Sequence, residues 1–159
     1  MKLIESKFPL VEVNALAEYE MSFKITPKRV TELLRKMTGV NTARAAPEIK
    51  VKINSLFYYP ARIPASATRL VTLASLVSDG VDVKLLLKAG GMGRLVEFAK
   101  KTGKFPTLFM VEPERELIAK TIGRKQADLV VVDPMAGGGS IPLEAKRLGF
   151  TVIAGDYNP

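Results

Sequence analysis

The feature that most constrains the fold of this chain is a stretch in which two short apolar runs flank a glycine turn and a helical segment. The first run, Leu129–Val132, ends at Asp133, and the second, Phe150–Ala154, is followed closely by Asp156. The segment between them, Ile141–Gly149, reads as a helix that stops at its glycine. A strand, a turn, a helix and a strand in this order predict the βαβ unit of a parallel sheet. The first run has no polar residue, so we expect a strand that is buried on both faces.

Three consecutive glycines, Gly137, Gly138 and Gly139, form the turn after the first predicted strand. Because glycine has no Cβ, a ligand can lie against bare backbone amides near the start of the following helix. Ligands of an open parallel sheet bind beyond the carboxyl ends of its strands, so Asp133 and Asp156 should lie beside this turn. Asp156 is then placed to accept hydrogen bonds from ribose hydroxyls. The sequence therefore predicts a nucleoside site.

Three kinds of nucleotide site compete for this turn. A phosphate-binding P-loop requires a lysine after the last glycine, and Ser140 stands there instead. A dinucleotide fingerprint requires a further glycine where Pro142 stands. An acid at the end of the first strand, Asp133, suits a cationic ligand better than a pyrophosphate. S-adenosylmethionine carries a sulfonium, an amino group and a ribose but no phosphate, so we expect it as the cofactor.

The same residues resemble a motif of amino-methyltransferases. Residues 133–140 read Asp-Pro-Met-Ala-Gly-Gly-Gly-Ser, and residues 155–159 read Gly-Asp-Tyr-Asn-Pro. In that class, Asp-Pro-Phe-x-Gly-x-Gly-Thr precedes a helix and a Gly-x-Asp/Glu-x-Asn-Pro, from which Met135 and Ser140 depart conservatively. The run Gly-Gly-Gly-Ser-Ile-Pro-Leu-Glu-Ala is most similar to prokaryotic adenine-specific DNA methylases. The Ile-Glu-Ser-Lys-Phe-Pro-Leu of residues 4–10 matches an opening segment of those enzymes as well.

This resemblance implies an α/β fold, in which the first βαβ unit of a partial Rossmann-like methyltransferase sheet follows a helical, basic N-terminal region. It implies methyl transfer from S-adenosylmethionine to an exocyclic amine of DNA, adenine N6, in a single displacement. Within the motif, Asp133 would contact the amino-acid end of the cofactor and Asp156 the ribose. The cofactor-binding residues expected in this part of the chain are Asp133, Pro134, Ala136, Gly137, Gly138, Gly139, Asp156, Tyr157 and Asn158.

A second segment is similar to another element of the class. Residues 57–64 read Phe-Tyr-Tyr-Pro-Ala-Arg-Ile-Pro, close to the His-Pro-Ala-x-Phe-Pro segment that closes over the methionine half of the cofactor. Tyr59 replaces the histidine and Ile63 the phenylalanine. The resemblance assigns Tyr59, Pro60 and Arg62 to the methionine end. Without it, the same residues describe an ordinary proline-punctuated helix entry with buried tyrosines, and their position upstream of Asp133 favours the functional interpretation.

The rest of the chain divides into a helical, basic region over residues 1–56 and an incomplete methyltransferase domain over residues 57–159. A helical insertion occupies about residues 79–125 of the second region. Asn14 and Thr26 are the expected caps of the first two helices, and Gly90–Gly93 is expected to be a turn that terminates a helix. Apolar spacing predicts helices over residues 15–21, 27–38, 65–78, 82–87, 93–101 and 112–122 and a strand over residues 49–53.

A formal net charge of +8 in 159 residues favours a polyanionic partner, DNA or else RNA. An ordinary solvated basic surface is the competing interpretation. Cysteine and histidine are both absent, which excludes disulfides, thiolate metal sites and a histidine base. The start has no signal-peptide core and no apolar run reaches membrane-spanning length, so we expect a cytoplasmic protein without membrane contact.

The catalytic half of the site is not identifiable. Amino-methyltransferases hold the target amine with an Asn/Asp/Ser-Pro-Pro-Tyr/Phe segment, and the chain has no such sequence. We therefore expect a cofactor-side half-site that is inactive alone. A missing C-terminal methyltransferase half, or self-association through the exposed sheet edge, would complete it. The alternatives are a fragment of an RNA or tRNA guanine methyltransferase, and a non-catalytic protein that binds nucleic acid or a partner and keeps a degenerate cofactor pocket.

Overall fold

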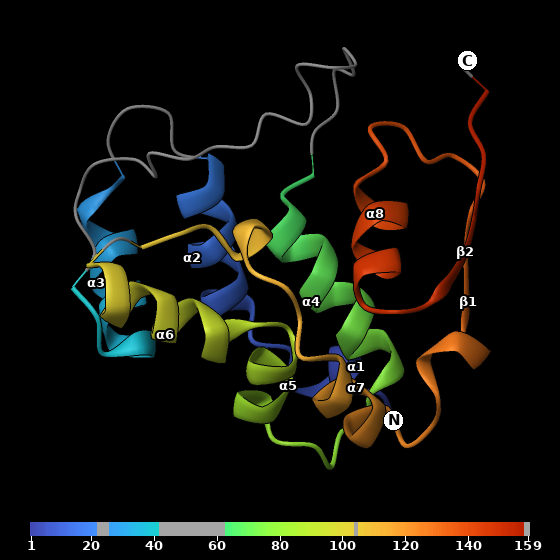
Figure 1. The fold of residues 1–159 in the computed structure, drawn as a ribbon, viewed down its shortest axis with the longest axis horizontal. Helices are drawn as coiled ribbons and strands as arrows, with labels where there is room; N and C mark the ends of the chain where they lie inside the picture. The colour runs from blue at the N-terminus through green and yellow to red at the C-terminus, as the bar shows by residue number, and fades with distance from the viewer. Residues whose placement is uncertain (22–25, 42–62, 104, 158–159) are drawn as a thin grey trace.

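The computed structural model describes residues 1–21, 26–41, 63–103 and 105–157 (Figure 1). This part of the chain is mixed α/β and mostly helical. Its helices are α1 (Leu3–Ser6), α2 (Leu10–Met21), α3 (Lys28–Thr38), α4 (Ala65–Leu76), α5 (Val83–Ala89), α6 (Met92–Thr102), α7 (Arg115–Ile122) and α8 (Ser140–Arg147), with 3-10 turns η2 (Leu108–Met110) and η3 (Gln126–Asp128). Its strands are β1 (Val130–Asp133) and β2 (Thr151–Ala154).

Helix α4 lies at the centre of the molecule, between α2 on one side and α8 on the other (Figure 1). Its Leu70 packs in a core cluster with apolar side chains of α2, α3 and α6. Leu73 and Ala74, the next inward positions, pack in a second cluster with side chains of α5, α7 and α8. Because α4 contributes to both clusters, it joins the N-terminal helices to the part of the chain that carries the sheet.

The two strands run parallel, and the register pairs Val130 with Thr151 and Asp133 with Ala154. Helix α8 connects them and packs against both strands. The order of strand, glycine turn, helix and strand that the sequence predicts is therefore confirmed. Two strands and one crossover helix do not identify a Rossmann-like methyltransferase sheet, so that assignment stays a prediction.

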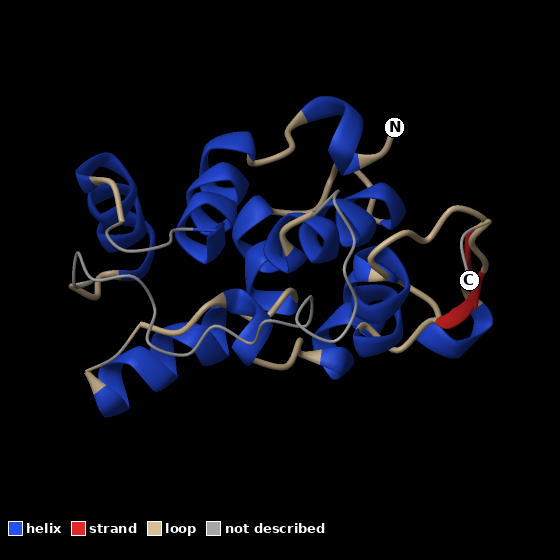
Figure 2. Cartoon of the chain, turned by 90° about the horizontal axis from the view of Figure 1, so that it is seen from above, coloured by secondary structure: helices blue, strands red, loops and turns tan. Residues whose placement is uncertain are grey.

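The prediction that β1 is buried on both faces is wrong for the described residues. Val131 faces the second core cluster, whereas Val130 and Val132 are 54% and 63% exposed. Ile153, the partner of Val132 on β2, is 59% exposed. The strands lie at the periphery of the molecule, and no described element covers their outer face (Figure 2). The apolar composition of β1 is thus typical of a strand covered on both faces, whereas here one face is exposed.

Several predicted helices begin or end at other residues than expected. Helix α2 starts at Leu10, so Asn14 is an exposed residue inside the helix and not its cap. The start is set by Pro9, whose carbonyl accepts from Val13 N at 2.9 Å. Thr26 does not cap α3: Pro27 occupies the N-cap position, and Thr26 Oγ1 is buried with no hydrogen-bond partner among the described residues.

The other helical predictions are close to the structure. Helix α3 ends at Thr38, as expected, and the next residue, Gly39, takes the left-handed conformation; Asp82 accepts from Lys84 N to cap α5. Gly90 and Gly91 form the turn between α5 and α6, which confirms the interpretation of this glycine cluster as a helix end. On α4, Val71 is 39% exposed.

Some predictions fall on residues that the structure does not describe. These are the strand over residues 49–53 and the candidate site residues Tyr59, Pro60, Arg62 and Asn158. The division of the chain near residue 56 stays a prediction too. Among the described helices, none has the length and apolar character needed to cross a bilayer.

Candidate functional site

The turn after β1 lies against the end of β2. Ala136 N donates to Gly155 O, and Gly155 N donates to Asp133 O, both at 2.9 Å. These two bonds extend the parallel pairing past the last strand residues. The glycine turn and the carboxyl ends of both strands therefore form one hydrogen-bonded unit.

Two glycines of the turn adopt backbone conformations that other residues rarely take. Gly137 has φ of 54° and Gly139 has φ of 74°. Gly139 is also the N-cap of α8, and its amide closes the turn by donating to Ala136 O at 2.9 Å. A Cβ placed on Gly139 would meet no atom of the described residues within 4 Å. Open space therefore lies next to bare backbone at the start of α8.

Both predicted carboxylates contact this turn. Asp156 Oδ2 accepts a hydrogen bond from Gly137 N at 2.5 Å. Asp133 Oδ1 accepts from Met135 N at 3.2 Å, which fixes the side chain at the start of the turn. Asp133 Oδ2 is buried and has no hydrogen-bond partner among the described residues. The structure thus brings together the two acids and the glycines that the sequence singled out.

The remaining predicted residues of the motif line the turn less closely. Pro134 and Gly138 are exposed, and Ala136, whose amide is bonded to Gly155 O, is half-buried. Tyr157 is 98% exposed, so its ring does not form a wall of the site in this conformation. The four predicted residues outside the described part of the chain add nothing to this geometry.

Sequence reasoning missed a buried ionic cluster behind the turn. Arg69 Nε of α4 donates to Glu144 Oε2 of α8 at 2.5 Å, and both side chains have an exposed fraction of 0%. Arg147 NH1 donates to the other oxygen, Oε1, at 2.9 Å. A local signal did exist: Arg69 stands four residues before the buried Leu73, and Glu144 four residues before the buried Leu148. Each charge therefore occupies an inward helical position.

Arg69 is the centre of this cluster. Its NH1 donates to Gly90 O at 3.0 Å, to Leu108 O at 3.0 Å and to Val111 O at 2.9 Å. Burial lowers the pKa of the Arg69 guanidinium, and the hydrogen bond and charge of Glu144 oppose that shift. Arginine stays protonated even so. Arg69 therefore keeps its positive charge in this buried position.

Arg147 holds the other side of the cluster. Its NH2 donates to Val111 O and to Glu112 Oε1, each at 3.0 Å. Its guanidinium also lies over the ring of Phe109, 4.8 Å from the ring centroid. Arg69 and Arg147 thus share the acceptor Val111 O as well as the carboxylate of Glu144.

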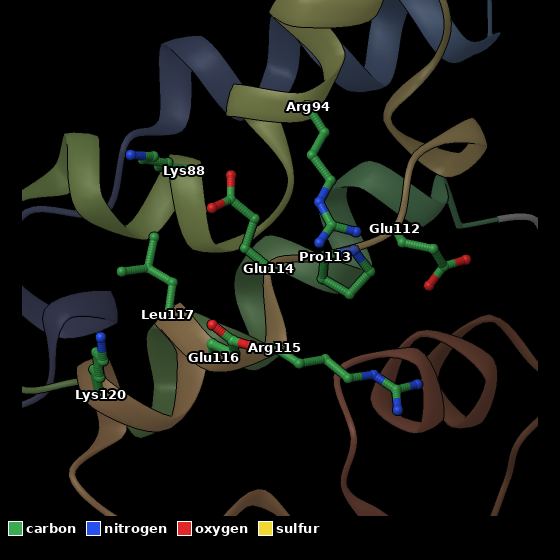
Figure 3. A pocket seen from close by; sticks show the side chains of 9 residues that line it. All are labelled: Lys88, Arg94, Glu112, Pro113, Glu114, Arg115, Glu116, Leu117 and Lys120. Carbon is green, nitrogen blue, oxygen red and sulfur yellow. The ribbon is translucent and has the colours of Figure 1, made fainter.

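A groove of about 640 Å³ opens between α5, α6 and α7 (Figure 3). It lies near the C-terminal end of α8, where Arg115 Nε donates to Arg147 O, and so at the other end of that helix from the glycine turn. Four basic and three acidic side chains line it together with a proline and a leucine: Lys88, Arg94, Arg115, Lys120, Glu112, Glu114, Glu116, Pro113 and Leu117. Because these charges nearly cancel, the groove favours neither an anion nor a cation.

The described residues contain no cluster of acidic side chains that could hold a metal ion. Comparison with known proteins returns no match, neither to a protein-family model, nor to a curated protein, nor to a solved structure. The function must therefore be inferred from the residues themselves.

Proposed function

We propose that this chain is the cofactor-binding part of an S-adenosylmethionine-dependent amino-methyltransferase, and that the cofactor binds over the glycine turn at the ends of β1 and β2. The observation that carries the proposal is the state of Asp133, whose Oδ2 is buried without a partner among the described residues. A buried carboxylate oxygen without a donor is costly. The amino group of the cofactor would supply that donor once the turn opens enough to expose this oxygen.

The second acid suits the ribose of the same ligand. A carboxylate can accept about four hydrogen bonds, so the bond from Gly137 N does not prevent Asp156 from accepting ribose hydroxyls as well. The open space beside Gly139 supports an approach of the ligand to the backbone. Two carboxylates at one turn also repel phosphate groups, which disfavours ATP and dinucleotides.

The proposed reaction is methyl transfer to an exocyclic amine of DNA, adenine N6, with an RNA or tRNA guanine as the alternative acceptor. The sequence resemblance and the net charge of +8 support a nucleic-acid substrate. We propose that the residues that hold the target amine belong to a catalytic methyltransferase half that packs on the sheet, or to a second copy of the chain, and that residues 1–159 are inactive alone. The exposed outer side chains Val130, Val132 and Ile153 support such a contact.

Calorimetry tests the cofactor assignment. The chain is titrated with S-adenosylmethionine, S-adenosylhomocysteine, ATP and NAD. We expect saturable heat with the first two, which share the ribose and the amino-acid end, and none with the phosphate-bearing ligands. Absence of heat with S-adenosylmethionine, while the chain retains duplex DNA on a filter, would favour a nucleic-acid-binding protein with a degenerate pocket. Methyl transfer to duplex DNA or to tRNA by the completed enzyme separates the two substrate classes.

A further inference from the structure

The ion pair between Arg69 and Glu144 joins the central helix α4 to α8, the helix that begins at the glycine turn (Figure 1). We propose that Arg69 and Glu144 are positioning residues of the cofactor site: their contact sets where α8, and with it Gly137–Gly139, lies relative to the helical core. This inference rests on the proposed function, because the glycine turn that the pair positions is the proposed binding surface for the cofactor.

The guanidinium of Arg69 cannot follow α8 if that helix shifts. Its NH1 is held by the carbonyls of Gly90, Leu108 and Val111, which belong to the end of α5 and to the segment around η2. The position of the Arg69 guanidinium therefore determines where the carboxylate of Glu144 lies. Arg147 binds the other oxygen of Glu144 and the same Val111 carbonyl, so α8 is held at two positions one turn apart.

Apolar packing alone would fix α8 less tightly. The fully buried apolar residues of this segment are Ala145 and Leu148, and Glu144 takes the third inward position. Apolar contacts are not directional, and replacement of a buried ion pair by apolar residues often keeps or raises stability. The hydrogen bonds from Arg69 Nε and Arg147 NH1 instead each fix the distance and direction of one oxygen of Glu144. A contact that positions α8 must depend on direction, and these hydrogen bonds do.

A chain of backbone hydrogen bonds connects α8 to the glycine turn and to the end of β2. Leu143 N donates to Gly139 O at 3.0 Å, and Gly139 N donates to Ala136 O at 2.9 Å. Ala136 is bonded in turn to Gly155 of the segment that ends at Asp156. A displacement of α8 would therefore strain the hydrogen bonds between the glycine turn and the strand ends that carry the two acids.

The test compares variants of the pair with a core variant. Arg69→Lys keeps the charge, but one ammonium group cannot serve Glu144 and three carbonyls. Glu144→Gln keeps the shape and loses the charge. Ile118→Val removes one methylene from the same core cluster without touching the pair, and so reports the effect of lowered stability alone. Affinity for S-adenosylmethionine is measured by calorimetry under conditions in which circular dichroism shows each variant folded.

We expect Arg69→Lys and Glu144→Gln to weaken cofactor binding about tenfold or more, because the ligand contacts depend on the geometry of the turn, and a misplacement of about 1 Å can cost about a hundredfold in the rate of a reaction that depends on geometry in the same way. Ile118→Val should bind as the unchanged chain does. Unchanged affinity in both pair variants, or an equal loss in Ile118→Val, would overturn the inference. If neither pair variant folds, Arg147→Gln removes the second partner of Glu144 and is judged by the same comparison.

A measurement without ligand separates this inference from the proposed function. Backbone amide resonances of Gly137, Gly139 and Ser140 are recorded for the unchanged chain, Arg69→Lys and Ile118→Val. We expect them to move in Arg69→Lys, although residue 69 lies on another helix, and to stay in place in Ile118→Val. Resonances that are unmoved in Arg69→Lys contradict the positioning role. Failure of the unchanged chain to bind S-adenosylmethionine would overturn only the proposed function.

Discussion

Nε of Arg69 donates to Oε2 of Glu144 across 2.5 Å, and these two residues are 75 positions apart in the chain. Both side chains are fully buried, so each charge depends on the other and on the hydrogen bonds around it. The contact joins α4, which builds both core clusters, to the helix of the βαβ unit. The two parts of the described chain are therefore linked by an ionic contact as well as by apolar packing.

Removal of one partner from this pair should destabilise the protein strongly. We expect Glu144→Leu to lower the free energy of unfolding by about 3–5 kcal/mol, because two arginines then lose their carboxylate. Lys146→Ala changes an exposed residue on the same helix and should stay within about 0.5 kcal/mol of the unchanged chain. Urea unfolding followed by circular dichroism measures both. A loss below about 1 kcal/mol in Glu144→Leu would show that the pair is dispensable.

The two faces of β1 should differ in their sensitivity to polar substitution. Val131 packs in the second core cluster, whereas Val132 is 63% exposed. Threonine has nearly the same shape as valine, so the comparison isolates the cost of burying a hydroxyl. We expect Val131→Thr to cost about 1–2 kcal/mol and Val132→Thr less than about 0.5 kcal/mol. Equal losses in urea unfolding would mean that something already covers the outer face in solution, such as a second copy of the chain.

Stability should fall at alkaline pH through Tyr19. Burial raises the pKa of the Tyr19 phenol from 10.0 to about 12, and its hydroxyl donates to Phe105 O at 2.7 Å. The unfolded chain thus releases this proton at lower pH than the folded chain does. The free energy of unfolding therefore decreases as the pH rises from 10 towards 12.

In Tyr19→Phe, the loss of the hydrogen bond should cost about 1 kcal/mol at neutral pH. Its unfolding free energy should nevertheless fall less steeply above pH 10, since the contribution of the Tyr19 phenol is gone. Denaturant unfolding at a series of pH values checks this. Identical slopes for the two proteins would contradict the assignment.

Gly139 and Gly123 form a matched pair for testing the glycine floor. Both have positive φ, 74° and 70°, and a Cβ on either would meet nothing within 4 Å in the part of the chain that the structure describes. Each alanine variant should therefore lose about 1–2 kcal/mol of stability through backbone strain alone. Only Gly139→Ala places a methyl group in the proposed site, so only that variant should bind S-adenosylmethionine more weakly. If Gly139→Ala and Gly123→Ala bind S-adenosylmethionine with equal affinity in calorimetry, Gly139 does not contact the cofactor.

The sequence predicts the βαβ unit well because its signals are local. The apolar runs, the glycines and the acids at the run ends lie within thirty residues of one another, and hydrogen bonds between neighbouring segments fix the turn. The prediction that both faces of β1 are buried is wrong for the described residues. The apolar sequence of β1 indicates that both faces favour burial, but it does not identify the element that would cover the outer face. The start of α2 was missed because Pro9 sets it with a backbone carbonyl, whereas side-chain capping pointed to Asn14.

The ionic cluster could not be predicted from periodicity. Arg69 and Glu144 each stand at an inward helical position, but in the sequence a charged residue there only interrupts the apolar stripe of its own helix. The two residues become an ion pair only because α4 packs against α8 in the folded chain. The turn at Gly90 and the segment around η2 complete the arrangement by offering carbonyls to Arg69, and their approach is a property of the tertiary fold.

The central claim is that Asp133 and Asp156 hold a cationic nucleoside over the glycine turn. Titration of the isotopically labelled chain with S-adenosylmethionine, followed through its backbone amide resonances, tests this most directly. We predict that the resonances of Gly137, Gly139 and Asp156 move together and saturate, while those of residues around the groove between α5 and α7 stay in place. A spectrum that does not change on addition of the cofactor, or changes confined to that groove, would contradict the account.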